Sequence, residues 1–488
     1  MSPPNPTPFV FHDPAGKRWP RLRILGLLSA LLLFAALTGF IQSLFVKPQL
    51  RLPSSVRQIK GQLRAIQQQA LAQPKALDWQ KFTKSGQAAP LPGASPKLAS
   101  ARPRAVQGIR AAFYTDWNPD SLRSLTEHGS QLTHLCLEWG TMTDGEGGLS
   151  FLDISKVQRI ASAQGIALMP ILSNLIGHQW LPEAVEGLAN GPAERRAAFI
   201  IKLLGAVQEA KVGGIMLNWE QVNPGAHENL ATFIEQLAQA LHSINKELWL
   251  QVPMNEEIKT FDLGRLTGTV DRFVASLTDE TSDDEPAGPI ASQDWFEGWL
   301  KVIDEYDCPD RWIAILGAYG YDWTEGKRRG EEISFCDAMS RASFAGVKTV
   351  ETGPPSFNPI FSYQEPGGNH TVCFLDAITF LNQLRAIKKL NLGGIAIQQL
   401  GEEDPQIWDV LTMRDVLAPS KKALDRLQKM RTSDTVTNVG QGEIVTVDDS
   451  RDDGVRAIKE IDGRYVATYS ADFPTYPTVF HQGAGDEH

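Results

Sequence analysis

Between residues 106 and 420, short apolar runs alternate with segments whose apolar residues recur at helical spacing. Eight of these runs have the length and composition of buried strands: 108–116, 132–139, 166–173, 213–220, 248–255, 271–278, 312–319 and 393–400. Near-continuous apolar strands that alternate with helices are typical of a parallel sheet covered by helices. Eight such units predict an α/β fold, a (β/α)8 TIM barrel. Its catalytic groups would lie at the carboxyl ends of the strands.

The helical spacing is clearest on either side of the fourth predicted strand. The apolar positions are Phe199, Ile200, Leu203, Leu204 and Val207 before it, and Leu230, Phe233, Ile234, Leu237, Leu241 and Ile244 after it. Asn223 and Pro224 stand where a helix N-cap and a first-turn proline are favoured. We therefore expect a helix between the third and fourth strands and another between the fourth and fifth.

An apolar segment near the N-terminus has a different character. Residues 24–46 contain no charged side chain, and 23 residues at ~1.5 Å per residue span a ~30 Å hydrocarbon core. The run is longer than the apolar core of a signal peptide, so we expect an uncleaved transmembrane helix. Basic residues crowd its N-terminal side, which favours a single-pass inner-membrane protein with a cytoplasmic N-terminus and a periplasmic or extracellular barrel.

These patterns divide the chain into five parts. We expect a cytoplasmic tail over 1–23, an anchor over 24–46, a basic helix and Pro/Ala-rich linker over 47–105, the barrel over 106–420, and a helix with a small β region over 421–488. In the last part, residues 436–470 form short strand-like runs with Asp-Gly turns, which predicts a small C-terminal β appendage.

Charge and cysteine usage narrow the function. Residues 1–110 carry 16 Lys and Arg against two acids, whereas residues 111–488 carry 31 against 55. An acidic body repels phosphate, so nucleic acid is not an expected partner. The four cysteines form no CxxC pair, and no metal site or other cofactor is predicted.

Several predicted strand ends carry sequence motifs. These are AAFYTDWNPD (111–120), LTHLCLEW (132–139), VGGIMLNWEQV (212–222), PAGPIASQDWFEGWL (286–300), GAYGYDW (317–323) and IQQLGEEDPQIW (397–408). Together they resemble the family 18 glycoside hydrolases, the chitinase-like barrels. The chain resembles more narrowly the first module of membrane proteins that join such a barrel to a polysaccharide deacetylase and a glycosyltransferase. That resemblance implies a deacetylase or glycosyltransferase as a further partner.

The resemblance implies a substrate-assisted route on a 2-acetamido sugar, an exception to the two-carboxylate scheme. Alternate strand residues face the same side, so Met216, Asn218 and Glu220 form the inward set. Glu220 stands where the family has its general acid. Asn218 replaces the carboxylate that assists the acetamido group, and Met216 replaces the acid before it.

Two more positions depart from the family pattern. The sixth strand normally ends in Met-x-Tyr-Asp; here Asp279 remains and Thr278 replaces the tyrosine. The last strand usually places a tryptophan under the sugar, and Gln398 stands there. Together with Asn218, these changes predict that hydrolysis is weak or lost.

The remaining candidates for sugar binding are Trp219, which precedes the predicted acid, and Glu138 at the end of the second strand. Each could instead be a packing residue or a solvated rim carboxylate. The leading hypothesis is a membrane-anchored module that binds a GlcNAc-containing polysaccharide. The alternatives are a glycosidase that acts on another glycan through Glu220, and a scaffold that docks a deacetylase or transferase.

Overall fold

The computed structural model describes residues 108–177, 179–429, 435–438, 443–446 and 456–469. The predicted anchor and linker, 24–46 and 47–105, lie outside these residues. Within the part of the chain that the structure describes, no helix is both long and apolar enough to cross a membrane.

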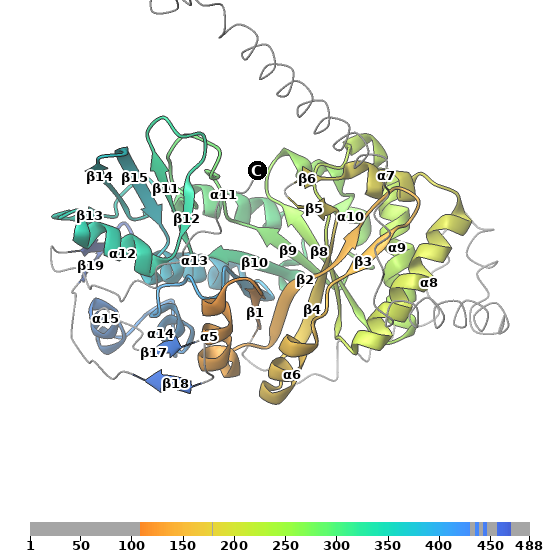
Figure 1. Ribbon diagram of the computed structural model, residues 1–488, viewed down its shortest axis with the longest axis horizontal. Helices are drawn as coiled ribbons and strands as arrows, with labels where there is room; N and C mark the ends of the chain where they lie inside the picture. Colours follow the sequence, from red (N-terminus) through yellow and green to blue (C-terminus); the bar gives the residue numbers. More distant parts are fainter. Residues whose placement is uncertain (1–107, 178, 430–434, 439–442, 447–455, 470–488) are drawn as a thin grey trace, which may run out of the picture. The chain divides into compact units, whose positions relative to one another are not determined.

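A closed barrel of eight parallel strands forms the centre of the structure (Figure 1). In order around the barrel, its strands are β1 (Ile109–Tyr114), β2 (His134–Met142), β4 (Ala167–Ser173), β7 (Gly214–Asn218), β8 (Glu247–Pro253), β9 (Arg272–Ser276), β10 (Trp312–Gly317) and β16 (Gly394–Gln398). The barrel closes because β1 pairs with both β16 and β2. Seven of the predicted apolar runs contain these strands whole or nearly so, and β2 continues beyond its run. The TIM-barrel prediction is therefore confirmed.

The helices follow the strands along the chain. They are α5 (Pro119–His128), α6 (Ser155–Gln164), α7 (Pro182–Ala189), α8 (Ala193–Ala210), α9 (His227–Ser243), α10 (Leu263–Leu266), α11 (Gln293–Asp304), α12 (Phe335–Phe344), α13 (Ala377–Leu390), α14 (Ile407–Leu411) and α15 (Lys421–Gln428). The two helices predicted around the fourth strand are α8 and α9. Asn223 caps a short 3-10 turn, η2 (Pro224–Ala226), that leads into α9, and its side chain accepts from the Gly225 amide at 2.8 Å.

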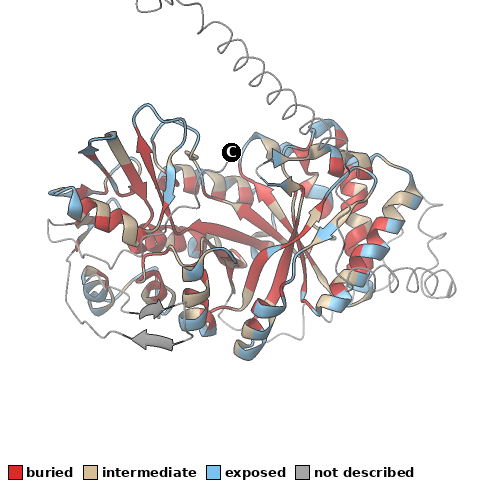
Figure 2. Ribbon diagram, in the orientation of Figure 1, coloured by how far each residue is buried: buried red, intermediate tan, exposed pale blue. Residues whose placement is uncertain are grey.

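The barrel interior is filled by apolar side chains from all eight strands. They include Ala111, Cys136, Met169, Ile171, Met216, Trp249, Val274, Ile313, Ile315 and Ala396. Figure 2 shows the strands as mostly buried. Because apolar side chains fill the barrel interior, the polar side chains of the strands that a ligand could reach lie at the strand ends.

A second sheet, called the inserted sheet, is built from strands that lie between β10 and β16 in the sequence and from two strands near the C-terminus. Its order is β12 (Glu331–Ile333), β11 (Gly320–Thr324), β15 (Gly368–Phe374), β14 (Ile360–Glu365), β13 (Val350–Glu351), β20 (Arg464–Tyr469) and β19 (Arg456–Ile461). Three short strands complete this list on the barrel side: β3 (Leu149–Phe151) beside β2, and the pair β5 (Leu175–Ile176) and β6 (Gln179–Trp180).

The strands predicted near the C-terminus are present. β17 (Thr435–Asn438) pairs with β18 (Glu443–Thr446), and β19 pairs with β20 around the Asp462-Gly463 turn. The β19–β20 hairpin also continues the inserted sheet, because β20 pairs with β13. The local sequence pattern predicted a separate appendage. The pairing of β20 with β13 makes the hairpin part of the inserted sheet.

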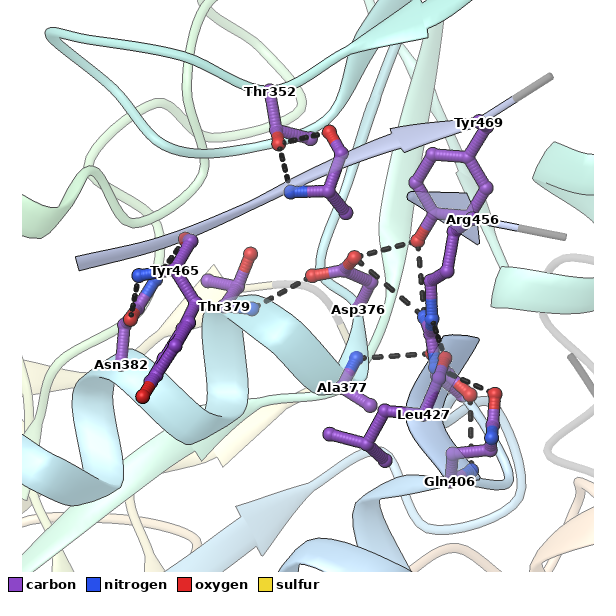
Figure 3. A network of polar contacts seen from close by, with 12 residues as sticks. Thr352, Asp376, Ala377, Thr379, Asn382, Gln406, Leu427, Arg456, Tyr465 and Tyr469 are labelled. Carbon is purple, nitrogen blue, oxygen red and sulfur yellow. Dashed lines mark hydrogen bonds and ion pairs between the residues drawn. The ribbon is translucent and has the colours of Figure 1, made fainter. Parts of the chain in front are cut away.

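A buried arginine fastens the hairpin to the barrel (Figure 3). Arg456 on β19 is fully buried and lies 2.6 Å from the Asp404 carboxylate, beyond the end of β16. It also donates to the Gln406 side chain and the Leu427 carbonyl, each at 2.6 Å. Tyr469 on β20 donates to Asp376, the N-cap of α13, at 2.5 Å. The polar groups of this core are therefore paired with one another.

Candidate functional site

Glu220 lies two residues beyond the end of β7, and its backbone is held from a neighbouring strand. Asn174, a fully buried residue that follows β4, donates to the Glu220 carbonyl at 3.0 Å and accepts from the Glu220 amide at 3.1 Å. The next residue, Gln221, has a φ of 58° and donates its amide to the Glu257 carboxylate at 2.8 Å. These contacts fix the direction in which the chain leaves the strand.

The surroundings of Glu220 favour its protonated form. Burial, with smaller contributions from the nearby carboxylates of Glu257 and Asp279, raises the pKa of Glu220 to about 7. A carboxyl group with a pKa near neutrality holds a proton that it can donate at physiological pH. The structure thus gives Glu220 the protonation behaviour of a general acid.

Asp279, three residues beyond β9, is oriented by two tyrosines. Tyr319 and Tyr321 both donate to the same carboxylate oxygen, Oδ1, at 2.7 and 3.0 Å. Asp279 has a φ of 57°, a left-handed conformation that is uncommon for residues other than glycine. Its side chain is accessible to solvent, yet desolvation by the surrounding protein raises its pKa, and the two tyrosine hydrogen bonds oppose this effect.

Neutral side chains occupy the strand-end positions that depart from the family 18 sequence pattern. Thr278 donates to the Gln398 side chain at 3.4 Å, so the ends of β9 and β16 meet across this contact. Asn218 ends β7 at the same face of the barrel and is half-buried. Met216 is fully buried in the barrel interior, as predicted for its inward position. We call Asn218, Thr278 and Gln398 the amide floor.

The other two predicted sugar-binding residues lie in different surroundings. Trp219 is 1% exposed and stacks on Phe233 of α9, with ring centroids 5.7 Å apart, which is a packing position between barrel and helix. Glu138 lies on β2 beside a register shift and is exposed at the surface. Desolvation nevertheless raises the pKa of Glu138. Neither residue has a hydrogen bond to the amide floor in the described structure.

Further side chains at these strand ends were missed by the sequence reasoning. Asn174, Tyr319 and Tyr321 hold the two acids, and Trp117 beyond β1 is 71% exposed. The two tyrosines lie within the GAYGYDW motif, and Trp117 lies within AAFYTDWNPD, so the motifs contained them. Asn174 has no such signal, because its role depends on β4 and β7 being neighbours.

Two more glutamates near the site have strongly raised pKa values. The side chain of Glu332 on β12 is accessible to solvent, yet desolvation by the surrounding protein, together with repulsion from Asp279 and Asp283, raises its pKa to about 7. Burial raises the pKa of Glu402, beyond β16, to about 8, with repulsion from Glu332 next in size. Asn118, beyond β1, donates to Glu402 at 2.9 Å. The carboxyl groups around the site therefore repel one another.

No cluster of three or more His, Cys, Asp and Glu side chains suited to a metal ion occurs among the residues that the structure describes. The four cysteines, all of which are described, are free thiols.

Comparison with known proteins agrees with the fold. No protein-family model matches the chain. The uncharacterized glycosylase YvbX of Bacillus subtilis is 24% identical over 239 residues, which cover 46% of this chain and 67% of YvbX. YvbX is described as a glycosylase.

Several solved structures have a fold similar to that of this chain. The spore cortex-lytic enzyme SleL of Bacillus megaterium has a TM-score of 0.58 at 17% identity, over 64% of this chain and 75% of SleL. A chitinase from Chromobacterium violaceum has a TM-score of 0.57 at 21% identity, over 64% of this chain and all of the chitinase. The chain therefore has the chitinase-like glycosidase fold that the sequence resemblance predicted.

Proposed function

We propose that the strand-end site binds a GlcNAc-containing polysaccharide and hydrolyses this polysaccharide weakly or not at all. The observation that carries this proposal is the pairing of Glu220, whose pKa is about 7, with a neutral Asn218 two residues earlier. The proton donor is in place, and the assisting carboxylate is absent. The fold shared with a chitinase and the exposed Trp117, which offers an aromatic face to a sugar ring, support the same ligand.

The chemistry of the substrate-assisted route explains why Asn218 matters. In that route the acid protonates the leaving oxygen while the substrate's own acetamido oxygen attacks C1, and positive charge develops on the sugar. A carboxylate beside the acetamido group stabilises that charge. An asparagine amide can hydrogen-bond the acetamido group but carries no negative charge, and loss of one stabilising group costs about 10²–10³ in rate.

One observation favours a second candidate function, hydrolysis of another glycan through Glu220 and Asp279. The two carboxyl groups are close enough for the charge on Asp279 to raise the pKa of Glu220. Asp279 is held by two tyrosines and remains accessible to solvent, so it could stabilise a cationic sugar. This function requires an ionised Asp279 beside a protonated Glu220.

We further propose that residues 24–46 anchor the protein in the inner membrane and hold the barrel outside the cytoplasm. The support is the uncharged 23-residue run and the basic residues before it. A deacetylase or glycosyltransferase partner is proposed only on the resemblance to the multi-module membrane proteins. Protease protection of tagged termini in inverted vesicles tests the topology, and a periplasmic N-terminus would contradict it.

The test of function is incubation of the full chain with GlcNAc oligomers, with products analysed by mass spectrometry and retention measured by affinity capture. We expect the wild-type protein to retain the oligomers and leave them largely intact. Asn218→Asp, which restores the carboxylate, is expected to raise turnover by up to about 10²–10³-fold. Adding Glu220→Gln to that variant removes the gain.

Each outcome has a distinct meaning. Absence of retention by every variant contradicts the proposed ligand. Rapid wild-type turnover that Asn218→Asp leaves unchanged contradicts the loss of catalysis. Turnover of a different glycan that disappears in both Glu220→Gln and Asp279→Asn favours the second candidate function.

A further inference from the structure

A cavity lies among α11, α13, the loop 354–357 and the turn of the β19–β20 hairpin. Its volume is about 490 Å³, within the ~300–1,000 Å³ that is usual for small-molecule sites. None of the described residues that line it lies on a barrel strand, and neither Glu220 nor Asp279 is among them. The cavity is therefore separate from the strand-end site. We call it the hairpin cavity.

Hydrogen bonds and ion pairs fix the walls of the hairpin cavity. Asn382 on α13 exchanges two hydrogen bonds with the Tyr465 backbone on β20, at 2.7 and 2.8 Å (Figure 3). Arg464, the first residue of β20, pairs with Asp294 and Glu297 of α11 at 2.7 and 2.9 Å. The hairpin is thus attached to both helices. Because these contacts preorganise the cavity, little ordering is needed when a ligand binds.

Two of the lining residues have a buried polar atom without a hydrogen-bond partner among the described residues. Gln293, the first residue of α11, is 2% exposed; its Nε2 donates to Glu297 at 2.8 Å, but its Oε1 is unpaired. The side chain of Arg385 on α13 is 11% exposed; its Nη1 donates to the Gly463 carbonyl at 2.8 Å, but its Nε is unpaired. Buried polar atoms in proteins are nearly always hydrogen-bonded. These two atoms therefore point to a ligand that offers both a donor and an acceptor.

Two charged residues at the exposed side of the cavity are also free of ion pairs with described residues. They are Lys389 on α13 and Asp462 in the hairpin turn. Lys389 lies four residues beyond Arg385, so the two cations share one face of the helix. The hairpin cavity thus offers free donors from α13 and free acceptors from α11 and the hairpin.

The charges of the lining residues balance, which favours a neutral ligand. The three cations and three acids are Arg385, Lys389, Arg464, Asp294, Glu297 and Asp462. A strongly charged ligand is repelled by one of the two sets, whereas a hydroxyl group can both donate and accept. The aromatic ring of Phe357 is 4% exposed and lies 4.9 Å from the Arg464 guanidinium, so it offers little surface for stacking. A sugar, with several hydroxyl groups on one ring, meets these requirements.

We propose that the hairpin cavity is a second carbohydrate-binding site, which holds a neutral sugar unit by hydrogen bonds. Arg385 and Lys389 donate to oxygens of the sugar. Gln293 and Asp462 accept from its hydroxyl or amide groups. This inference goes beyond the proposed function, which concerns the strand ends; only the choice of a GlcNAc probe rests on that function. Two sites on one chain bind a polysaccharide more tightly than either site alone, provided that the polymer can reach both.

The experiment is titration calorimetry of the full chain with the GlcNAc disaccharide at ~0.02 and ~0.5 M salt. We expect binding at two sites, and because the disaccharide is neutral, salt should leave both affinities nearly unchanged. The double variant Lys389→Ala/Asp462→Gly removes the two free charged groups. Both residues are exposed, and glycine suits the positive φ of 51° at Asp462, so the variant should fold like wild type. It is expected to weaken one site at least about tenfold and to leave the other unchanged.

Lys388→Ala/Asp425→Ala is the matched control. Lys388 on α13 and Asp425 on α15 are exposed, and neither lines the hairpin cavity, so both sites should survive. Sugar binding that Lys389→Ala/Asp462→Gly leaves unchanged overturns this inference and leaves the proposed function intact. Loss of one site at ~0.5 M salt also overturns it, because a neutral ligand is not displaced by salt. A single site that the variant weakens supports the inference and contradicts the proposed function, whereas absence of all binding overturns both.

Discussion

At the scale of single residues, the two acids of the site are positioned by different kinds of hydrogen bond. Glu220 is positioned through its backbone, which is bonded on both sides by Asn174. Asp279 is positioned through its side chain, which accepts hydrogen bonds from Tyr319 and Tyr321. Because both tyrosines bond Oδ1, the second carboxylate oxygen has no such partner and is available to a ligand.

The tyrosine pair yields a prediction about affinity. In the double variant Tyr319→Phe/Tyr321→Phe, Asp279 loses two hydrogen bonds, each of which contributes about 1.5–3 kcal/mol when the acceptor is an ionised carboxylate. We expect the affinity of the strand-end site for GlcNAc oligomers, measured by calorimetry, to fall at least about tenfold. The Asp279 pKa should rise as well, because the bonds that oppose its increase are gone.

Tyr306→Phe is the control for this prediction. Tyr306 packs beside Trp312, with ring centroids 5.8 Å apart, and precedes β10 at the amino ends of the strands, away from the site. Its variant loses the same hydroxyl group and should bind like wild type. If the double variant keeps full affinity, Asp279 is not oriented by the tyrosines for binding.

The sequence predicted the acids better than their supports. Glu220 and Asp279 were found because a motif at a strand end is a local feature of the chain. Asn174 could not be found in this way, because its hydrogen bonds to Glu220 cross from β4 to β7, 46 residues apart. The exposure of Trp117 and the burial of Trp219 also depend on packing, which the motif letters do not encode.

At the scale of elements, the β19–β20 hairpin is joined to the barrel by a buried charge cluster (Figure 3). Arg456 contacts Asp404 at 2.6 Å and Asp376 at 3.7 Å, and all three side chains are almost completely buried. Removal of one partner from a buried ion pair leaves an uncompensated charge in a medium of low polarity. Arg456 thus supplies the buried cation of an attachment that also includes the pairing of β20 with β13 and the hydrogen bond from Tyr469 to Asp376.

Arg456→Met is expected to lower the free energy of unfolding by about 3–5 kcal/mol, because two buried carboxylates lose their cation. Denaturant unfolding measures this loss. Arg464→Met, on the same hairpin, is the matched control. Arg464 is partly exposed and pairs with Asp294 and Glu297 near the surface, so its loss should cost about 1 kcal/mol or less. Equal losses in the two variants would show that burial of Arg456 does not govern the attachment.

The barrel strands were predictable and the inserted sheet was not. Each barrel strand is an apolar run buried on both faces, which makes it visible in a short window of sequence. The strands β11 to β15 instead form antiparallel pairs with one another. The strand β13 also pairs with β20, which lies more than 110 residues later in the chain. A pattern of neighbouring residues carries no information about such a partner.

At the scale of the whole molecule, the raised pKa values make stability depend on pH. The carboxyl groups of Glu220 and Glu332 have pKa values of about 7 and that of Glu402 about 8, above the value of 4.5 for an unperturbed glutamate. Between pH 4.5 and 8 the folded chain therefore binds more protons than the unfolded chain. Stability then falls as pH rises through this range.

We expect the Tm of the full chain to be lower at pH 8.5 than at pH 5.5. In the double variant Glu332→Gln/Glu402→Gln, two carboxyl groups that lose protons as the pH rises are absent. The decrease in Tm between the two pH values should therefore be smaller than in wild type. Differential scanning calorimetry at the two pH values measures the difference. A wild-type Tm that is unchanged or higher at pH 8.5, or a decrease that the double variant does not reduce, contradicts the raised pKa values.

The most direct test of the central claim is a crystal structure of the full chain grown with a GlcNAc oligomer. The account predicts an intact oligomer at the strand ends, with an N-acetyl group beside Asn218 and Gln398 and the Glu220 carboxyl group facing a glycosidic oxygen. An oligomer bound elsewhere on the barrel, with this site empty, would contradict the account.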